Sequence, residues 1–264
     1  MLSSYLLVDT TLIDESCEKL WLKKERYPTW IATVYGRDAA EVSPIIIDIQ
    51  QAIKFSKISA IMKIINSKRP QLGISIIEST LSLEHIVRHF RNFIYVRTKS
   101  GKDLTLRFAD CAVLPSLAAV FEAKQWAALT APFESWKIHD RDGNLFPLPI
   151  SNQHDLSSTP LTLTQHQVST LRETMAADQL LFHLRMQRPA DPSLYLTAIA
   201  HRYATQCRHM WHEAGNVDDV DLVSFAGYVF DTEGSLLDSP HLLSILAERD
   251  RKEREEFLKK IINS

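Results

Sequence analysis

Short apolar runs alternate with segments of helical spacing along the first half of the chain. Four runs rich in β-branched or aromatic residues are bounded by turn formers, which predicts β-strands at residues 5–9, 30–36, 44–49 and 72–77. Between the last two, apolar side chains recur at helical intervals with lysines on the opposite side, as at Ile53, Ile58, Ile61 and Ile65. This spacing predicts one amphipathic helix, ended by the basic turn at residues 68–70.

A helix and a hairpin are predicted next. Ser82 can cap a helix whose apolar positions recur at helical spacing, namely Leu83, Ile86, Val87 and Phe90. Residues 94–98 and 104–108 then alternate between apolar and polar positions on either side of Gly101. This pattern predicts a β-hairpin that turns at the glycine.

Asp110 stands directly before an apolar run, residues 111–121, that is typical of a helix. Its carboxylate can accept the free amide hydrogens of the first helical turn. Pro115 indicates either a later start of this helix or a kink in it. A short helix is expected after residue 121, followed by a terminal hairpin around Gly143.

The composition changes beyond this hairpin. Residues 147–164 contain three prolines and many Ser, Thr and Asn residues, which is typical of a linker. Apart from a strand candidate at 228–230, the rest predicts helices at about 164–187, 192–213, 218–230 and 239–262, the last broken near Asp250. The predicted domains are an α+β or α/β lobe with a mixed β-sheet and flanking helices at 1–150, a linker at 151–163 and an all-α lobe at 164–264.

Charge and composition exclude several classes of protein. The chain of 264 residues has 30 Lys and Arg against 32 Asp and Glu, so no basic field favours binding to nucleic acid. No apolar run approaches the roughly 20 residues of a membrane helix, and the N-terminus lacks the basic start of a signal peptide. We therefore expect a cytoplasmic protein without membrane insertion. Its three cysteines are odd in number and widely spaced, which favours buried thiols over disulfides or a zinc site.

Motifs that would carry chemistry are missing from the sequence. It contains no GxSxG, GxGxxG, Walker loop, HExxH or EF-hand pattern, and seven glycines leave few places for a phosphate cradle. Residues 139–142 combine His, Asp and Arg, but they surround the turn at Gly143 and are better explained as a polar hairpin tip than as an acid/base group. We expect no catalytic residue, no cofactor and no small-molecule substrate.

The helix predicted at 192–213 has one polar face. Its apolar stripe is expected to contain Leu196, Ile199, Tyr203, Cys207 and Met210. His209 and His212 could share a face, but His201 lies about 16 Å further along the axis, so the three cannot bind one metal ion. The polar face is either solvated or a contact patch for an acidic partner, formed by Arg202, Arg208, His209 and His212.

The stretch YVRTKSGKDLTLRFAD, residues 95–110, concentrates charge around one turn. A structural interpretation assigns the turn to Gly101, packing to Phe108 and helix capping to Asp110, with Arg97 and Arg107 bracing loops. A phosphate site at the two arginines would need a third donor, and Asp110 would oppose it. These residues are therefore expected to form a structural corner.

The order of elements through this stretch resembles the domain of the type VI secretion effector adaptors. That pattern has a Ser-Leu-Glu helix with a His-x-Arg element, an Arg-bearing strand, a Gly turn, an Arg-Phe strand and an Asp before a helix. Its features fall on Ser82, Leu83, Glu84, His89, Arg91, Arg97, Gly101, Arg107, Phe108 and Asp110, and continue on Val113, Leu114, Leu117, Gln125, Trp126, Pro132 and Trp136. Ala109 and Cys111 depart from it, since an aromatic residue and a proline are usual there.

The resemblance covers residues 5–138, and the tail around 227–246 is similar to helical extensions of secretion-associated proteins. It implies a non-catalytic adaptor or chaperone in the cytoplasm of a Gram-negative bacterium. Such a protein binds a toxin effector near the effector's N-terminus and loads it onto the C-terminal region of the valine-glycine repeat spike protein. The cleft between the two lobes would then hold the partner. Two alternatives remain at this point: an enzyme with an active site between the lobes, and a structural component associated with the baseplate.

Overall fold

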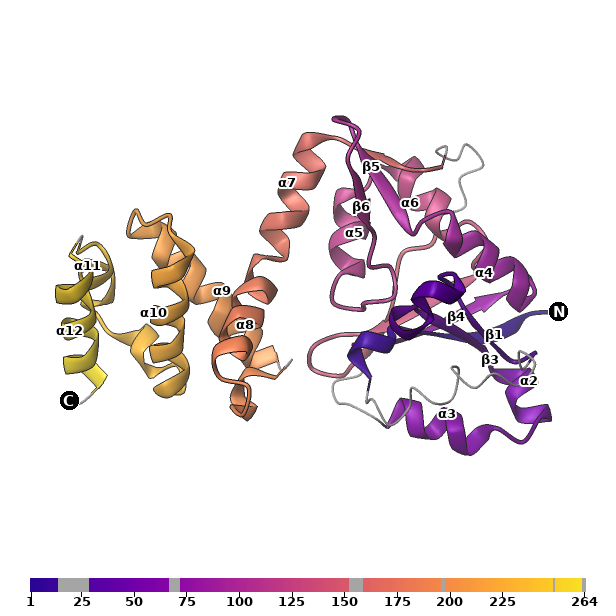
Figure 1. Ribbon diagram of the computed structural model, residues 1–264, viewed down its shortest axis with the longest axis horizontal. Helices are drawn as coiled ribbons and strands as arrows, with labels where there is room; N and C mark the ends of the chain where they lie inside the picture. Colours follow the sequence, from indigo (N-terminus) through magenta and orange to yellow (C-terminus); the bar gives the residue numbers. More distant parts are fainter. Residues whose placement is uncertain (14–28, 67–71, 152–158, 196–197, 249, 263–264) are drawn as a thin grey trace. The chain divides into compact units, whose positions relative to one another are not determined.

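The computed structural model describes residues 1–13, 29–66, 72–151, 159–195, 198–248 and 250–262. The chain forms two compact units, Met1–Arg172 and Glu173–Ser264. The first combines two β-sheets with helices, and the second is helical, which confirms the predicted fold class. Figure 1 shows the elements, with labels on the helices and on some of the strands.

Among its described residues, the first unit contains nine strands, five complete α-helices and most of the boundary helix α7. The strands are β1 (Ser3–Val8), β2 (Ile31–Thr33), β3 (Ile45–Asp48), β4 (Ile74–Ser79), β5 (Tyr95–Thr98), β6 (Asp103–Thr105), β7 (Ser135–His139), β8 (Leu145–Pro147) and β9 (Thr162–Leu163). The helices are α2 (Ile49–Lys54), α3 (Ile58–Ile65), α4 (Leu83–Arg91), α5 (Leu114–Val120), α6 (Ala123–Thr130) and α7 (Gln165–Thr174), with short 3-10 turns η1 (Thr10–Leu12) and η3 (Arg37–Val42).

Six strands form the main sheet in the order β2-β3-β1-β4-β7-β8, and every neighbouring pair is antiparallel. The four strands predicted from the first half of the sequence are β2, β3, β1 and β4. Their register places Leu6 opposite Ile47 and Ile76, so apolar side chains of adjacent strands share a face. The mixed pairing occurs in the smaller sheet, β6-β5-β9, where β9 runs parallel to β5.

Both faces of the main sheet are covered by helices (Figure 1). On one face, Ile61 and Ile64 of α3 pack into a cluster with Leu6, Val8 and other strand residues. The opposite face carries an aromatic cluster to which α4 and α6 contribute, described below with the site. A layer of helices on each face explains why runs such as Ile45–Asp48 are buried throughout instead of alternating.

The helix predicted across residues 50–70 is two helices. Ser56 adopts a left-handed conformation with φ of 56° and ends α2. The Lys57 amide donates to the Ala52 carbonyl at 2.8 Å and the Ser56 amide to the Ile53 carbonyl at 2.9 Å, which is the bond pair of a Schellman motif. Glycine usually occupies such a position, so a serine there carries no signal in the sequence. The break leaves Ile53 and Ile58, both predicted to lie in a buried stripe, about half exposed.

The hairpin predicted around Gly101 is formed by β5 and β6, and that around Gly143 by β7 and β8. Both glycines have the left-handed φ that such turns require, 83° and 86°. The apolar run after Asp110 begins with a turn, and the helix itself, α5, starts only at Leu114 with Pro115 in its first turn. Of the two possibilities that Pro115 indicates, a later start or a kink, the later start is therefore the one observed.

The boundary between the units lies later than the linker predicted at 151–163. Thr162 and Leu163 form β9, and the start of α7 also belongs to the first unit. Gln167 explains this, because its buried amide donates to Gln125 Oε1 at 2.7 Å and to the Val120 carbonyl at 3.0 Å. These bonds join α7 to the ends of α5 and α6. Residues 152–158 of the predicted linker lie outside the described residues.

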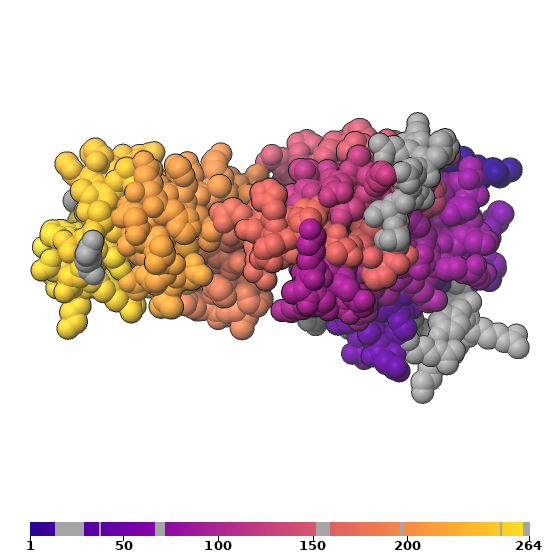
Figure 2. All heavy atoms as spheres, turned by 90° about the horizontal axis from the view of Figure 1, so that it is seen from above, coloured from indigo at the N-terminus to yellow at the C-terminus, as the bar shows by residue number. Residues whose placement is uncertain are grey.

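The second unit is built from helices around its own core. Its elements are α8 (Ala176–Gln187), η4 (Pro192–Leu194), α9 (Ala198–Glu213), α10 (Asp219–Asp231), η5 (Ser235–Asp238), α11 (Leu242–Leu246) and α12 (Arg251–Ile262). Leu181, Trp211, Phe225 and Leu246 are among the buried residues of this core. Figure 2 shows its atoms, coloured orange to yellow, as one packed body.

Three predictions for the second unit need correction. The strand candidate at 228–230 lies inside α10, where the buried residues Phe225, Ala226 and Val229 recur at helical spacing. The region predicted as one helix at 164–187 is α7 and α8, separated at Met175. Of the predicted stripe of α9, Cys207 is buried and Tyr203 and Met210 pack against the core, but Ile199 is 52% exposed and Leu196 lies outside the described residues. The buried face is completed by Ala200, Ala204 and Trp211.

Arg254 fixes the C-terminal helix to the rest of this unit. Its guanidinium lies over the Trp211 ring, 4.9 Å from the ring centroid, and forms an ion pair with Asp221. The side chain is nearly buried, so the pair replaces hydration that Arg254 loses on folding. The break predicted near Asp250 is confirmed: α11 ends at Leu246, and the Asp250 carboxylate accepts the Lys252 amide at the start of α12.

None of the helices that the structure describes is both long and apolar enough to cross a membrane.

Candidate functional site

Arg107 lies between two carboxylates at the corner between β6 and α5. Its Nη2 is 3.2 Å from Asp9 Oδ2 and 3.2 Å from Asp110 Oδ2. Both aspartate side chains are only 9% exposed, whereas the arginine side chain is 46% exposed. We call these three residues the arginine clamp. It joins the end of β1 to the corner that closes the hairpin.

The electrostatics of the clamp favour a charged arginine. Burial alone would lower the pKa of Arg107, but the adjacent carboxylates of Asp110 and Asp9 outweigh burial and raise it. Tyr35 lies within the same field, and its pKa is raised by burial first and then by the negative charge of Asp9. Two carboxylates against one guanidinium leave the clamp with a net negative charge. The clamp therefore opposes a phosphate ligand, as the sequence suggested.

Asp9 and Asp110 also bind backbone amides close to them in the sequence. Asp9 Oδ1 accepts the Thr11 amide at 3.0 Å, which caps the turn η1. Asp110 Oδ1 accepts the Ala112 amide at 2.9 Å, so the predicted capping role falls on the turn that precedes α5. Each carboxylate thus has one oxygen for the backbone and one for Arg107, which fixes two turns and the clamp together.

His89 and Phe108 belong to an aromatic cluster beside the clamp. Phe108 is fully buried and stacks on Phe90 with centroids 4.8 Å apart. Phe90 also contacts Phe133 and Trp136, at 5.4 and 5.8 Å. Such offset and edge contacts are favourable beyond the area they bury. The cluster is the core above the main sheet, which is why a Phe follows the clamp arginine.

His89 closes one side of this cluster. Its Nε2 lies 2.8 Å from the Leu129 carbonyl, so this nitrogen donates to α6, and its ring lies 4.9 Å from that of Phe93. Burial lowers the pKa of His89, with the bond to Leu129 acting in the opposite direction. A neutral imidazole that donates to a carbonyl joins α4 to α6. It does not point at a partner group that it could activate.

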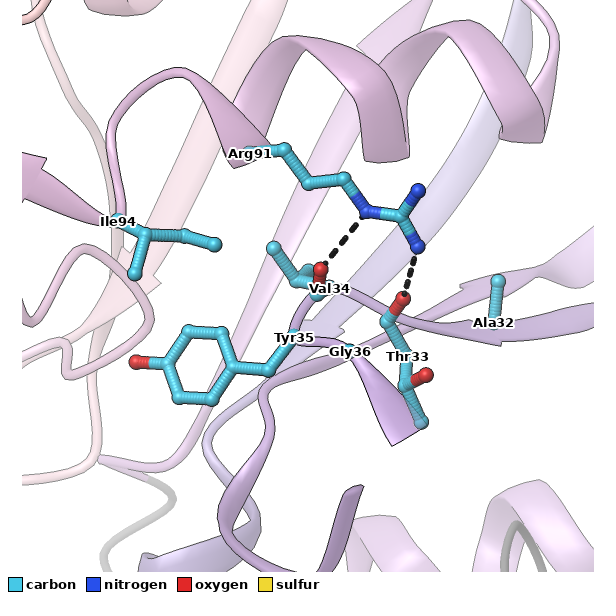
Figure 3. A pocket seen from close by; sticks show the side chains of 7 residues that line it. All are labelled: Ala32, Thr33, Val34, Tyr35, Gly36, Arg91 and Ile94. Carbon is cyan, nitrogen blue, oxygen red and sulfur yellow. Dashed lines mark hydrogen bonds between the residues drawn. The ribbon is translucent and has the colours of Figure 1, made fainter. Parts of the chain in front are cut away.

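Arg91 lines a surface hollow of about 510 Å³ at the end of β2 (Figure 3). Its Nε donates to the Val34 carbonyl at 2.9 Å, and Nη2 lies 3.5 Å from the Thr33 carbonyl. Tyr35 and Ile94 form the apolar part of the lining. The arginine therefore holds the end of an edge strand against α4, and its position is explained without a ligand.

Arg97 pairs across the hairpin with Asp103, with Nε 2.9 Å from Oδ1. Both side chains are about half exposed, so water screens the pair and its contribution is small. The turn is closed by the Gly101 amide, which donates to the Thr98 carbonyl at 2.9 Å. Arg97 and Arg107 are thus used separately and do not form a shared anion site.

The four residues predicted as a partner patch are all on α9. Arg202 and His209 are exposed, whereas the Arg208 side chain is 17% exposed and lies 3.3 Å from Glu173. His212 Nδ1 contacts the Asn216 carbonyl at 3.2 Å, and His209 Nε2 lies 3.6 Å from Glu213. Arg208, His209 and His212 therefore already have acidic or carbonyl partners within the unit, which lessens the attraction of Arg208 for an acidic partner.

The described cysteines are buried thiols. Burial raises the pKa of Cys111 to about 12 and raises that of Cys207 further still. Neither thiol is therefore available as a thiolate near neutral pH. Cys17 lies outside the described residues. Among the residues that the structure describes, no group of three or more His, Cys, Asp or Glu side chains could hold a metal ion.

Two members of the site were not singled out from the sequence, namely Asp9 and Tyr35. Asp9 follows an apolar strand directly, and a carboxylate at the end of a buried strand is a usable signal in hindsight. Its partner is 98 positions away, however, and no local pattern links the two. Tyr35 lies within the strand predicted at residues 30–36, and the neighbouring residues do not indicate its place beside the clamp.

The first unit is an α+β domain whose charged motif residues support a corner of the fold. Residues 4–128, most of that unit and a little under half of the chain, match the family described as "Domain of unknown function (DUF4123)". The matched range includes every residue of the arginine clamp together with His89, Arg91, Arg97, Gly101 and Phe108. No curated protein and no solved structure matches the chain.

Proposed function

We propose that the chain is a non-catalytic adaptor that binds a type VI secretion effector in the cytoplasm and loads it onto the spike protein. The match of residues 4–128, a domain known from effector-associated contexts, carries this proposal together with the ordered motif from Ser82 to Asp110. On this account the effector offers its N-terminal region, and the spike protein offers its C-terminal region.

The contacts of the motif residues support binding rather than catalysis. Arg107 is paired with two carboxylates, His89 donates to a backbone carbonyl and Phe108 is buried. A catalytic acid or base needs an approachable position and a pKa near the working pH. Residues that instead hold turns and helices together are what a rigid binding scaffold requires.

Coexpression with a candidate toxin, chosen from the genes adjacent to this one, tests the proposal. We expect a tagged chain to recover the toxin in a fixed ratio, and the toxin's N-terminal region alone to be sufficient. Addition of the spike protein's C-terminal region should give a ternary complex. Recovery of sheath or baseplate proteins in place of the toxin would favour a structural component. Turnover of a small compound, lost on replacing a single polar residue, would favour an enzyme.

A further inference from the structure

The helices α2 and α3 present apolar side chains to solvent close to one another in the sequence. Ile53, Phe55, Ile58 and Met62 are 51%, 52%, 52% and 47% exposed. Single exposed apolar residues are ordinary, but four within ten positions of two consecutive helices are a concentration that is typical of a contact site. We call these four residues, with Lys54 and Lys57, the α2–α3 surface.

The break at Ser56 creates this surface. A continuous helix would keep the isoleucines in one stripe against the sheet. The left-handed Ser56 ends α2, and α3 then buries Ile61 and Ile64 while Ile58 and Met62, one helical turn apart, remain exposed. The chain thus adopts a residue conformation that is unfavourable for serine, and it exposes apolar area in doing so. Neither feature contributes to the stability of the unit.

The charge of this surface is uniform. Residues 49–66 contain three lysines, at positions 54, 57 and 63, and no Asp or Glu, in a chain whose net charge is −2. Lys54 and Lys57 are exposed. Within the part of the chain that the structure describes, no carboxylate lies within ion-pair distance of either. Apolar side chains beside the exposed Lys54 and Lys57 are complementary to apolar side chains flanked by carboxylates.

We propose that the α2–α3 surface binds an amphipathic helix of a partner protein. The apolar face of that helix is flanked by Asp and Glu. A helix fits because α2 and α3 satisfy their own backbone hydrogen bonds and offer no strand edge, so the partner must satisfy its own backbone as well. The assignment of this helix to a secretion effector rests on the proposed function. The match between the surface and an acidic amphipathic helix is independent of the proposed function.

A fluorescent synthetic peptide tests the surface directly. The peptide carries leucines at helical spacing flanked by glutamates, and its matched control carries lysines in place of the glutamates. Fluorescence anisotropy should show binding of the acidic peptide alone, weakening as salt is added because exposed charges are screened. Phe55→Asp with Met62→Asp should weaken binding by about tenfold or more, as hot-spot replacements do. Lys54→Glu with Lys57→Glu should also weaken it.

Matched controls are available on the same chain. Phe182→Asp replaces an equally exposed aromatic of the other unit, and Lys99→Glu with Lys102→Glu makes the same charge change on the hairpin. Both should bind the acidic peptide as the unchanged protein does. Failure of the unchanged protein to bind it, or equal binding of both peptides, would overturn the proposal. So would unchanged binding by the α2–α3 variants.

Two further measurements exclude other occupants. Met62 should be oxidised readily by hydrogen peroxide in the free protein and protected by the acidic peptide; protection without peptide would mean that this chain itself covers the surface. A dimer that Phe55→Asp converts to a monomer would assign the surface to a second copy. Either result would overturn the proposal. If a toxin complex forms and the α2–α3 variants leave it intact, the assignment of the surface to an effector helix fails while the proposed function stands. If no toxin complex forms, the peptide measurement alone decides whether the surface binds an acidic helix.

Discussion

Arg107 Nη2 lies 3.2 Å from Asp9 Oδ2, although the two residues are 98 positions apart in the chain. The contact joins the end of the central strand β1 to the corner after β6. Asp110 shares the same guanidinium, so one arginine pairs with two nearly buried carboxylates at once. The most charged stretch of the motif is therefore a long-range tie within the fold.

Replacing Arg107 should expose how much the fold depends on this tie. Arg107→Gln leaves two poorly solvated carboxylates without their cation, and we expect the free energy of unfolding to fall by about 1–3 kcal/mol. Asp9→Asn, which keeps the capping oxygen, should partly rescue it, because neighbouring charges are coupled rather than additive. Urea denaturation of the four proteins of this cycle measures the coupling. Arg97→Gln, which breaks only an exposed pair, is the control and should change stability little.

His89 should make stability depend on pH. Its pKa in the folded protein is lowered by burial, so below the ordinary value of about 6.5 the unfolded chain takes up a proton that the folded chain resists. The contribution of His89 is complete above that pH and declines as pH falls, by at most about 1.4 kcal/mol per pH unit. His89→Gln keeps a donor for the Leu129 carbonyl and should flatten the decline between pH 7 and 5, as measured by thermal melts. A parallel decline in both proteins would contradict this account.

Phe108 should be among the most sensitive core positions. Its ring is fully buried and stacks on Phe90. Phe108→Ala creates a cavity in the aromatic cluster and should cost about 3–5 kcal/mol, whereas Phe108→Leu should cost less because more volume is retained. Chemical denaturation with tryptophan fluorescence suits this test, since Trp136 belongs to the same cluster. A loss below 1 kcal/mol on replacement by alanine would show that the cluster is loosely packed.

Gly101 and Gly234 should respond differently to replacement by alanine. Both have a left-handed φ, 83° and 87°, so each replacement costs about 1–2 kcal/mol in backbone conformation. A Cβ at position 101 would meet nothing within 4 Å, whereas one at 234 would lie 2.5 Å from the Tyr203 ring. Gly234→Ala should therefore be the more damaging of the two. Pairing it with Tyr203→Leu should recover the steric part of the loss; no recovery would mean that the ring moves aside without cost.

The sequence predicted the strands and the corner because their signals are local. Strand runs such as residues 44–49, and the glycines at 101 and 143, are short-range features that determine backbone conformation directly. The structure places Gly101 in the hairpin turn, Phe108 in the aromatic cluster and the Asp110 carboxylate on the Ala112 amide. The sequence predicts the α9 stripe only in part, because two of its buried positions are Ala200 and Ala204, whose small side chains resemble surface alanines in a sequence.

Features that depend on distant partners were not predictable in this way. β9 is two residues long and has no period to recognise, and its place is determined by β5 and by the buried amides of Gln125 and Gln167. The Schellman turn at Ser56 lacks the expected glycine. The first case places the boundary between the units later than predicted. The second exposes apolar side chains that were predicted to be buried, and so produces the α2–α3 surface.

Formation of a toxin complex tests the central claim most directly. The tagged chain and a candidate toxin, chosen from the adjacent genes, are coexpressed, and the purified material is analysed by size-exclusion chromatography with light scattering. The account predicts one species whose mass is the sum of the two proteins in a fixed ratio, with the toxin remaining in solution only when the chain is present. A chain that elutes at its own mass, with the toxin's solubility unchanged, would contradict it.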